Sequence, residues 1–159
     1  MPKEPLHEPF SLTKGETGVT QQDGLNASTD WGQIFEYQVP TGIGLIILPG
    51  HTFSCYLHGD DGAEMPATTQ VRILHKDSSK SGDAKKVLGP ILYVKLKEFT
   101  NKDKIAIFDI LKPTKVYEKQ YLIIETAGAD TAGTGGVDVA GGTKESYFEA
   151  AISRVRQPL

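Results

Sequence analysis

The chain has 159 residues, with 17 Lys and Arg against 20 Asp and Glu, so its formal net charge is −3. This near balance argues against a dedicated nucleic-acid binder, which usually carries a clear basic excess. No stretch is polybasic, and no run approaches the ~20 apolar residues of a transmembrane helix. We therefore expect neither a nucleic-acid partner nor a membrane partner. A chain of this length is expected to form one main domain.

Residues 1–30 differ in composition and in apolar pattern from the rest of the chain. Pro and Gly are frequent there, and the apolar side chains follow no period. Because such a segment cannot bury enough apolar surface to fold alone, we predict an extended N-terminal arm over 1–30, either lying on another surface or loose. Residues 31–159 are predicted to form the domain, and this domain should fold without the arm. The start has no apolar stretch typical of a secretion signal, so synthesis in a cytoplasm is expected.

Short apolar and β-branched runs, separated by clusters of Gly, Pro, Asn and Asp, fill the remainder of the chain. We predict eight strands, at residues 33–39, 44–48, 52–57, 70–76, 91–97, 105–111, 121–126 and 146–156. That spacing is typical of an all-β, two-sheet antiparallel sandwich. A jelly roll is the commonest eight-stranded form, and we expect it here. An immunoglobulin-like sandwich is the alternative, although the Cys…Trp…Cys spacing of antibody domains is missing.

Alternation within the runs predicts which side chains face the core. Val71 and Ile73 should point inward with Arg72 outward, and the run 33–39 alternates with one slip at Ile34. The other predicted inward residues are Phe53, Cys55, Leu57, Leu92, Val94, Leu96, Leu122, Ile124, Phe148, Ala150 and Ile152. Residues 45–48 and the run 105–111 are apolar on both faces. An exposed face there would be an interface, unless a loop or the arm covers it.

No pattern of metal ligands stands out. The four histidines are His7, His51, His58 and His75. They contain no His-x-His pair, and His51 and His58 should lie ~20 Å apart at the two ends of one strand. We interpret them as surface or loop residues. Three acidic residues share one loop that could hold Ca²⁺ but lacks the EF-hand order, and we interpret them as a solvated turn: Asp60, Asp61 and Glu64. We predict no metal site and no cofactor.

Catalytic patterns are missing as well. The single cysteine, Cys55, lies in an alternating run and is interpreted as a small core residue. No Gly-x-Ser-x-Gly elbow occurs. Asp109, on an apolar run, is interpreted as a strand-end or interface group. The glycine-rich stretch 133–144 lacks the order of a phosphate-binding loop and is interpreted as a flexible loop. We therefore predict no catalytic residues, and no enzyme.

Some residues could contribute to binding surfaces. Exposed aromatic rings could stack on sugars if several shared one surface; the candidates are Trp31, Tyr56, Tyr93, Tyr117 and Tyr147. Two basic groupings give a faint nucleic-acid signal: Tyr93 with Lys95 and Lys97, and Arg154 with Arg156. The sequence alone does not bring any of these residues together.

An extended arm, a compact eight-stranded body and the missing catalytic set combine in one resemblance. The stretches that carry it are residues 49–53, 65–69 with 71–73, and 88–93. In layout over the whole chain, the sequence resembles the auxiliary (decoration or cement) proteins on the heads of tailed bacteriophages. Members of this family are often trimers at the three-fold positions of the capsid and reach neighbours with terminal arms.

The resemblance implies a non-enzymatic structural protein located in the virion. It implies the major capsid protein and the chain itself, as a homotrimer, as partners; no functional residue is carried over. A carbohydrate-binding β-sandwich module is the alternative, and coplanar exposed aromatic rings would favour it. A small jelly-roll enzyme of the cupin type is a third hypothesis, against which the missing His-x-His pair weighs.

Overall fold

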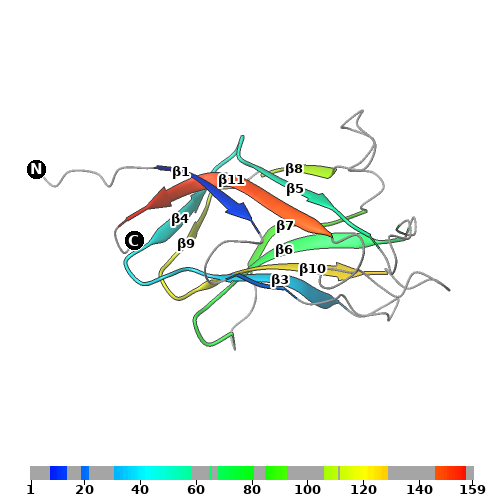
Figure 1. Ribbon diagram of the computed structural model, residues 1–159, viewed down its shortest axis with the longest axis horizontal. Helices are drawn as coiled ribbons and strands as arrows, with labels where there is room; N and C mark the ends of the chain where they lie inside the picture. Colours follow the sequence, from blue (N-terminus) through cyan, green and yellow to red (C-terminus); the bar gives the residue numbers. More distant parts are fainter. Residues whose placement is uncertain are drawn as a thin grey trace, which may run out of the picture.

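The computed structural model describes residues 8–13, 19–21, 31–58, 65, 68–80, 85–92, 106–110, 112–128 and 146–156 (Figure 1). For ten positions inside the strands only the backbone is described: 20, 21, 86, 91, 92, 106–109 and 147. Every element in these ranges is a β-strand. The described residues accordingly contain no helix of the length and apolar character needed to cross a membrane.

The strands form two antiparallel sheets, which confirms the predicted two-sheet sandwich. The β11 sheet has six strands: β1 (Glu8–Thr13), β4 (Gly44–Ile47), β5 (Thr52–Tyr56), β8 (Ala106–Asp109), β9 (Thr114–Val116) and β11 (Tyr147–Val155). The β10 sheet has five: β2 (Val19–Gln21), β3 (Gly32–Gln38), β6 (Gln70–Lys76), β7 (Lys85–Leu92) and β10 (Tyr121–Ala127). In Figure 1 the β11 sheet occupies the upper part of the view and the β10 sheet the lower part.

The β11 sheet contains two interrupted strands. On one side β11 pairs with β1, and on the other it pairs first with β5 and then with β4. Because β4 and β5 are both antiparallel to β11, they run in the same direction as two halves of one strand. β9 and β8 pair with these halves in turn. The break is the predicted Pro49-Gly50 turn, in which the His51 N–H donates to the Leu48 carbonyl at 3.0 Å and Gly50 has φ +91°.

The β10 sheet follows the order β2-β3-β10-β6-β7, with β10 in the centre. Its pairing explains the slip in alternation at Ile34. Phe35 lies opposite Ile124 and Gln33 lies opposite Glu125, so Ile34 is one extra residue between two paired positions. Ile34 is 0% exposed. The slip is therefore a β-bulge, which places two consecutive apolar side chains out of solvent.

The core lies between the sheets and confirms the predicted inward residues whose side chains are described. These buried residues are Phe53, Cys55, Leu57, Val71, Ile73, Leu122, Ile124, Phe148, Ala150 and Ile152. On β4, Leu45, Ile46 and Ile47 are all buried within the single chain. Leu48, the last residue of this doubly apolar run, is 36% exposed, so the run is closed within the chain at its first three positions only. For residues 105–111 only Ile110, which is buried, has a described side chain. Val94 and Leu96 lie outside the described residues.

The N-terminal segment differs from the predicted division at residue 30. Residues of the predicted arm form β1 on the β11 sheet and β2 on the β10 sheet, so the sandwich begins before residue 31. Phe10 and Leu12 of β1 are 7% and 1% exposed and belong to the core. The alternation there is short and begins beside Pro9, which an edge strand tolerates because it need not donate to a further neighbour.

Two further strands were not predicted. β7 begins at Lys85, ahead of the strand predicted at 91–97, and passes through Gly89-Pro90. These two residues sit at a register irregularity opposite Arg72, because Val71 pairs with Ile91 and Ile73 with Leu88. A Gly-Pro pair that resembles a turn in sequence is thus a bulge on an edge strand. β9 has three residues, too few to show a period.

Candidate binding groove

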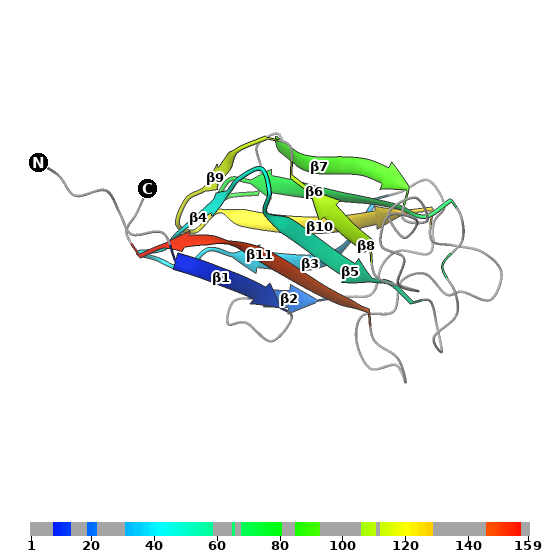
Figure 2. The same cartoon turned by 90° about the horizontal axis from the view of Figure 1, so that it is seen from above.

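The sandwich leaves two strands without a second partner on one side of the molecule. Among the described strands, β7 pairs with β6 alone and β9 pairs with β4 alone. Figure 2 shows β7 and β9 at the same margin. A groove of about 330 Å³ lies there, and we call it the β7–β9 groove; its lining residues are His75, Lys85, Lys112, Pro113, Thr114, Lys115 and Tyr117.

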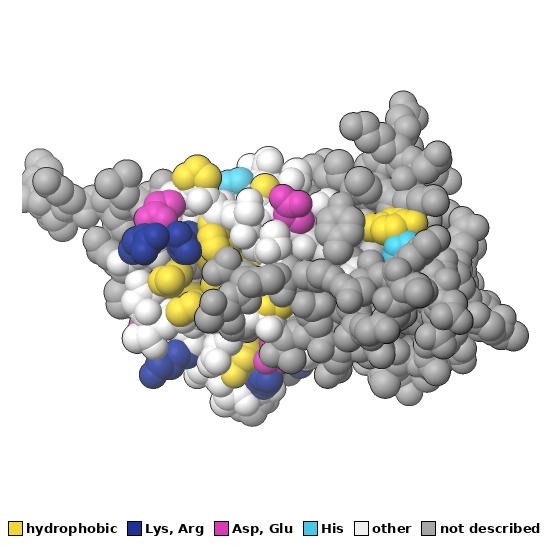
Figure 3. All heavy atoms as spheres, viewed as in Figure 1, with side chains coloured by type: hydrophobic (Ala, Val, Ile, Leu, Met, Phe, Trp, Pro, Cys, Tyr) yellow, Lys and Arg dark blue, Asp and Glu magenta, His cyan; other side chains and the backbone are white. Residues whose placement is uncertain are grey.

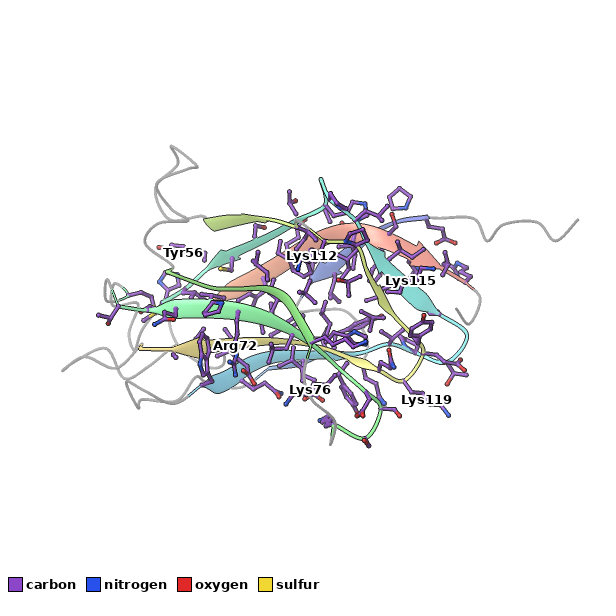
Figure 4. All side chains as sticks on the ribbon, turned by 180° about the vertical axis from the view of Figure 1, so that it is seen from behind. Tyr56, Arg72, Lys76, Lys112, Lys115 and Lys119 are labelled. Atoms are coloured by element: carbon purple, nitrogen blue, oxygen red, sulfur yellow. The ribbon has the colours of Figure 1, made fainter. Side chains whose placement is uncertain are left out.

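The groove is positively charged. Lys85, Lys112 and Lys115 are exposed, and none of them forms an ion pair with any residue in the described ranges. Among the described residues that line the groove there is no Asp or Glu. Figure 4 shows Lys112 and Lys115 together along the β9 segment, with Lys76 and Lys119 apart from them. Cations gathered along one hollow without counter-charges raise the local concentration of anions.

One end of the groove is held by a hydrogen-bonded glutamine. The side-chain Oε1 of Gln120 accepts the backbone N–H of Tyr117 at 3.0 Å and lies 2.8 Å from Nε2 of His75. Since Oε1 is an acceptor, Nε2 of His75 carries the proton in this contact. The buried His75 of β6 is thus tied to the turn that follows β9. This bond fixes the exposed Tyr117 at the rim.

Lysine and proline at these strands also have a structural role. Unpaired sheet edges can template aggregation, and native proteins discourage this with charged residues and proline on the edge. Lys85 and Pro90 lie on β7, and Pro113 and Lys115 lie on or beside β9. Edge protection explains why each of these two strands, considered alone, carries a charged residue.

A second hollow, also about 330 Å³, lies beside β1 and is lined by Ser153 and His51, whose side chains are in contact. Oγ of Ser153 is 3.5 Å from Nε2 of His51, whose Nδ1 accepts the Leu48 N–H at 3.0 Å. An Nδ1 that accepts a hydrogen bond is unprotonated, so in the neutral ring the proton is on Nε2. Nε2 then cannot accept the serine proton, and this pair is not arranged as a nucleophile and base.

The two arginines that gave a nucleic-acid signal are occupied within the chain. Glu8 accepts hydrogen bonds from Arg154 at 3.0 Å and from Arg156 at 2.6 Å, and Arg154 lies 4.6 Å from the centre of the Phe10 ring. The bonds from Arg156 and then Arg154 lower the pKa of Glu8 below its ordinary value of 4.5. In Figure 3, basic and acidic side chains lie next to each other toward the end of the molecule from which the N-terminal trace extends. We call Glu8 and its two arginine partners the Glu8 clamp.

Cations on the outer face of the β10 sheet are paired too. Arg72 donates to Glu125 at 2.7 Å and lies 4.0 Å from the centre of the Trp31 ring. Lys80 is 2.7 Å from a carboxylate oxygen of Glu36, and this hydrogen bond raises the pKa of Lys80. These contacts confirm that Arg72 points away from the core. Unlike these paired cations, the described lysines of the β7–β9 groove lie together without a described acidic partner.

The interpretation of the histidines as surface or loop residues is wrong for His75, which is buried on β6 with its ring against Gln120. His58 follows the end of β5, in line with the loop interpretation, but it is buried, and its backbone N–H donates to Ser146 at 2.9 Å. Within the described ranges no three His, Cys, Asp or Glu residues lie together as a possible metal site. Cys55 is buried, as predicted.

Several other candidates cannot be placed. His7, the acidic loop, the glycine-rich stretch, Tyr93, Lys95 and Lys97 lie outside the described residues, as do the side chains of Asp109 and Tyr147. The three described aromatic candidates are separate: Trp31 packs with Arg72, Tyr56 packs edge-on with His58, and Tyr117 borders the groove. They form no shared platform.

The sequence did not predict the groove because Lys85 lies between two predicted strands and Lys112 directly follows another. The spacing of Lys112 and Lys115 around Pro113 was the available signal, but the approach of β7 to β9 depends on long-range pairing. No protein-family model matches the sequence, and no curated protein matches it. Functional argument therefore rests on the fold and on the geometry of the described residues.

Proposed function

We propose that this chain is a non-enzymatic structural protein of a virion, which decorates or cements a capsid as a homotrimer and contacts the major capsid protein. The observation that supports this proposal is the strand order. If β4 with β5 and β8 with β9 each count as one interrupted strand, and the short β2 is set aside, eight positions remain. Their order along the chain is then first-eighth-third-sixth in one sheet and second-seventh-fourth-fifth in the other.

That order supports a jelly roll, which we propose as the finer description of the sandwich. Jelly rolls occur in viral capsid domains, in lectin domains and in cupins. The link from this fold to a virion is an analogy, because one fold supports many functions. The Ser153–His51 geometry gives no support to an enzyme. A lectin-like module is the second candidate, because Tyr117 is exposed beside polar groups in a hollow.

The first test is the mass in solution, measured by light scattering on a size-exclusion column across a range of concentrations. A homotrimer would have a mass of about 52 kDa, three times the 17.3 kDa of the chain. A monomer at every concentration would contradict the trimer.

The second test is quantitative mass spectrometry of particles purified from the virus that encodes the chain. A decoration protein should be present in a fixed ratio to the major capsid protein, and it should be released by mild denaturant before the shell dissociates. Absence from intact particles would contradict the proposed function.

A further inference from the structure

We propose that the β7–β9 groove binds an anionic saccharide, meaning a sugar ring that carries a sulfate, phosphate or carboxylate group. This inference goes beyond the proposed structural role and does not depend on it. The lysines would contact the oxyanion, and Tyr117 with Pro113 would contact the face of the ring. The volume of about 330 Å³ is at the lower end of the range of small-molecule sites.

The charge distribution supports the anionic part of the ligand. The chain as a whole carries a net charge of −3, yet Lys85, Lys112 and Lys115 line one hollow, and no acidic residue is among its described lining. Elsewhere, the described ion pairs each join a cation to a carboxylate: Arg72 to Glu125, Lys80 to Glu36, and Arg154 and Arg156 to Glu8. The groove lysines therefore remain available to an external anion.

Edge protection alone does not explain this arrangement. Protecting an edge requires charge on each strand but no convergence of charges from two strands. Lys85 comes from the start of β7, directly across the ladder from His75, while Lys112 and Lys115 come from the β9 segment of the other sheet. Both sheets thus contribute cations to the same hollow.

Tyr117 supports the saccharide part. Tyr117 is 40% exposed, and among the described residues the other exposed large hydrophobic one is Leu48, at 36%. The bond from the Tyr117 N–H to Gln120 holds the tyrosine backbone at the rim, so less conformational entropy is lost when a ligand contacts it. An aromatic ring next to lysines and a threonine hydroxyl offers an apolar face together with hydrogen-bond donors, as a charged sugar requires.

Lysine acts as a point charge and does not select the geometry of one anion. Sulfate, phosphate and carboxylate groups therefore share the proposed chemistry. The probes are N-acetylglucosamine 6-sulfate, N-acetylglucosamine 6-phosphate and glucuronic acid, each titrated into the full chain at constant ionic strength. Two-dimensional NMR of the backbone amides follows the binding. Uncharged N-acetylglucosamine and inorganic sulfate are the reference ligands.

The expected result is saturable binding of at least one charged sugar, with shifts centred on Thr114, Lys115 and Tyr117. That sugar should bind more tightly than both the neutral sugar and inorganic sulfate, and the ranking of the three probes identifies the preferred anion. Equal binding of inorganic sulfate and sugar sulfate would overturn the saccharide assignment. Failure of every charged sugar to bind would overturn the proposal, whatever the outcome for the virion.

Matched variants test the residues. The groove variant, Lys112→Gln with Lys115→Gln, is expected to weaken charged-sugar binding about tenfold or more, because each nearby charge contributes about fivefold in water. The control, Lys76→Gln with Lys119→Gln, removes the same charge outside the groove and should change binding less than twofold. Tyr117→Ala should abolish the preference for sugar sulfate over inorganic sulfate. Equal losses of charged-sugar affinity in the groove and control variants would show that only the overall positive charge matters, and would contradict a specific site.

Discussion

At the β1 edge, a single carboxylate, Glu8, accepts hydrogen bonds from Arg154 and Arg156. The β7–β9 groove instead gathers three lysines, and the part of its lining that the structure describes contains no carboxylate. Both regions lie at the side of the sandwich, where a sheet lacks a further described strand. At the first edge the charges complete a contact within the chain. At the second they remain directed to solvent.

The two edge strands also differ in how much they contribute to the core. β1 has six residues and contributes Phe10 and Leu12 to the core, while β9 has three residues and contributes Val116. The comparison indicates that the β1 edge stabilises the fold and that the groove can change its side chains at little cost in stability. The following experiments test this difference, beginning with the largest expected effect.

Deleting residues 1–13, which removes β1, should leave the chain unfolded or barely folded. Truncating a buried leucine costs about 2–5 kcal/mol and a buried phenylalanine about 3–5 kcal/mol, against a total stability of about 5–15 kcal/mol. Circular dichroism and urea denaturation measure the effect. A deletion variant with an unchanged urea midpoint would instead restore the view, drawn from the sequence, of a domain that folds without this segment.

A single substitution separates the two edges more finely. Leu12→Ala should reduce the free energy of unfolding by about 2–5 kcal/mol, because its side chain is almost fully buried and leaves a cavity. Tyr117→Ala at the exposed rim should change it by less than about 1 kcal/mol. Urea denaturation of both variants provides the measurement. Similar losses would mean that the groove rim is part of the folding core.

The sequence predicted the central strands well because they are long enough to show alternation. The run 70–76 coincides with β6, and Leu122 and Ile124 are buried as the period requires. Even the irregularity at Ile34 carried information, since it marks the bulge on β3. The local sequence pattern is informative wherever a strand has one buried face and is long enough to repeat the two-residue alternation at least twice.

Edge strands and the groove were not predictable in the same way. β2 and β9 have three residues each, and β7 crosses a Gly-Pro pair that resembles a turn. The groove is formed by residues from β6, β7 and the β9 segment, which pairing across the chain brings together. A single sequence contains no signal for that approach, because sheet pairing between distant segments is set by tertiary packing.

Within the Glu8 clamp, Arg154→Gln should lower the free energy of unfolding by a small amount. It removes one bond to the solvent-accessible Glu8 and the contact with the Phe10 ring, and both kinds of contact are weak where water reaches them. Lys112→Gln, which removes a lysine without an ion pair in the described structure, is the matched comparison. We expect the arginine variant to lower the urea midpoint and the lysine variant to leave it unchanged. The reverse order would break the comparison between the edges.

The clamp should also respond to pH. Because the bonded arginines lower the pKa of folded Glu8 below 4.5, its contribution to stability is fully present above the unfolded pKa. That contribution is lost as the pH falls through the folded pKa. The difference in unfolding free energy between the natural chain and Glu8→Gln should therefore shrink below about pH 4.5. A difference that stays constant from pH 7 to pH 3 would show that the carboxylate charge is not what matters.

The smallest effect on stability is expected for the double variant Lys112→Gln with Lys115→Gln. Removing two neighbouring like charges relieves repulsion, so the free energy of unfolding should stay within about 0.5 kcal/mol or rise slightly at low ionic strength. Added salt should cancel any gain, because screening weakens the same repulsion. Denaturation at two salt concentrations measures this. A loss above about 1 kcal/mol, or new aggregation, would assign the lysines to protection of the β9 edge, and the two edges would then both be structural.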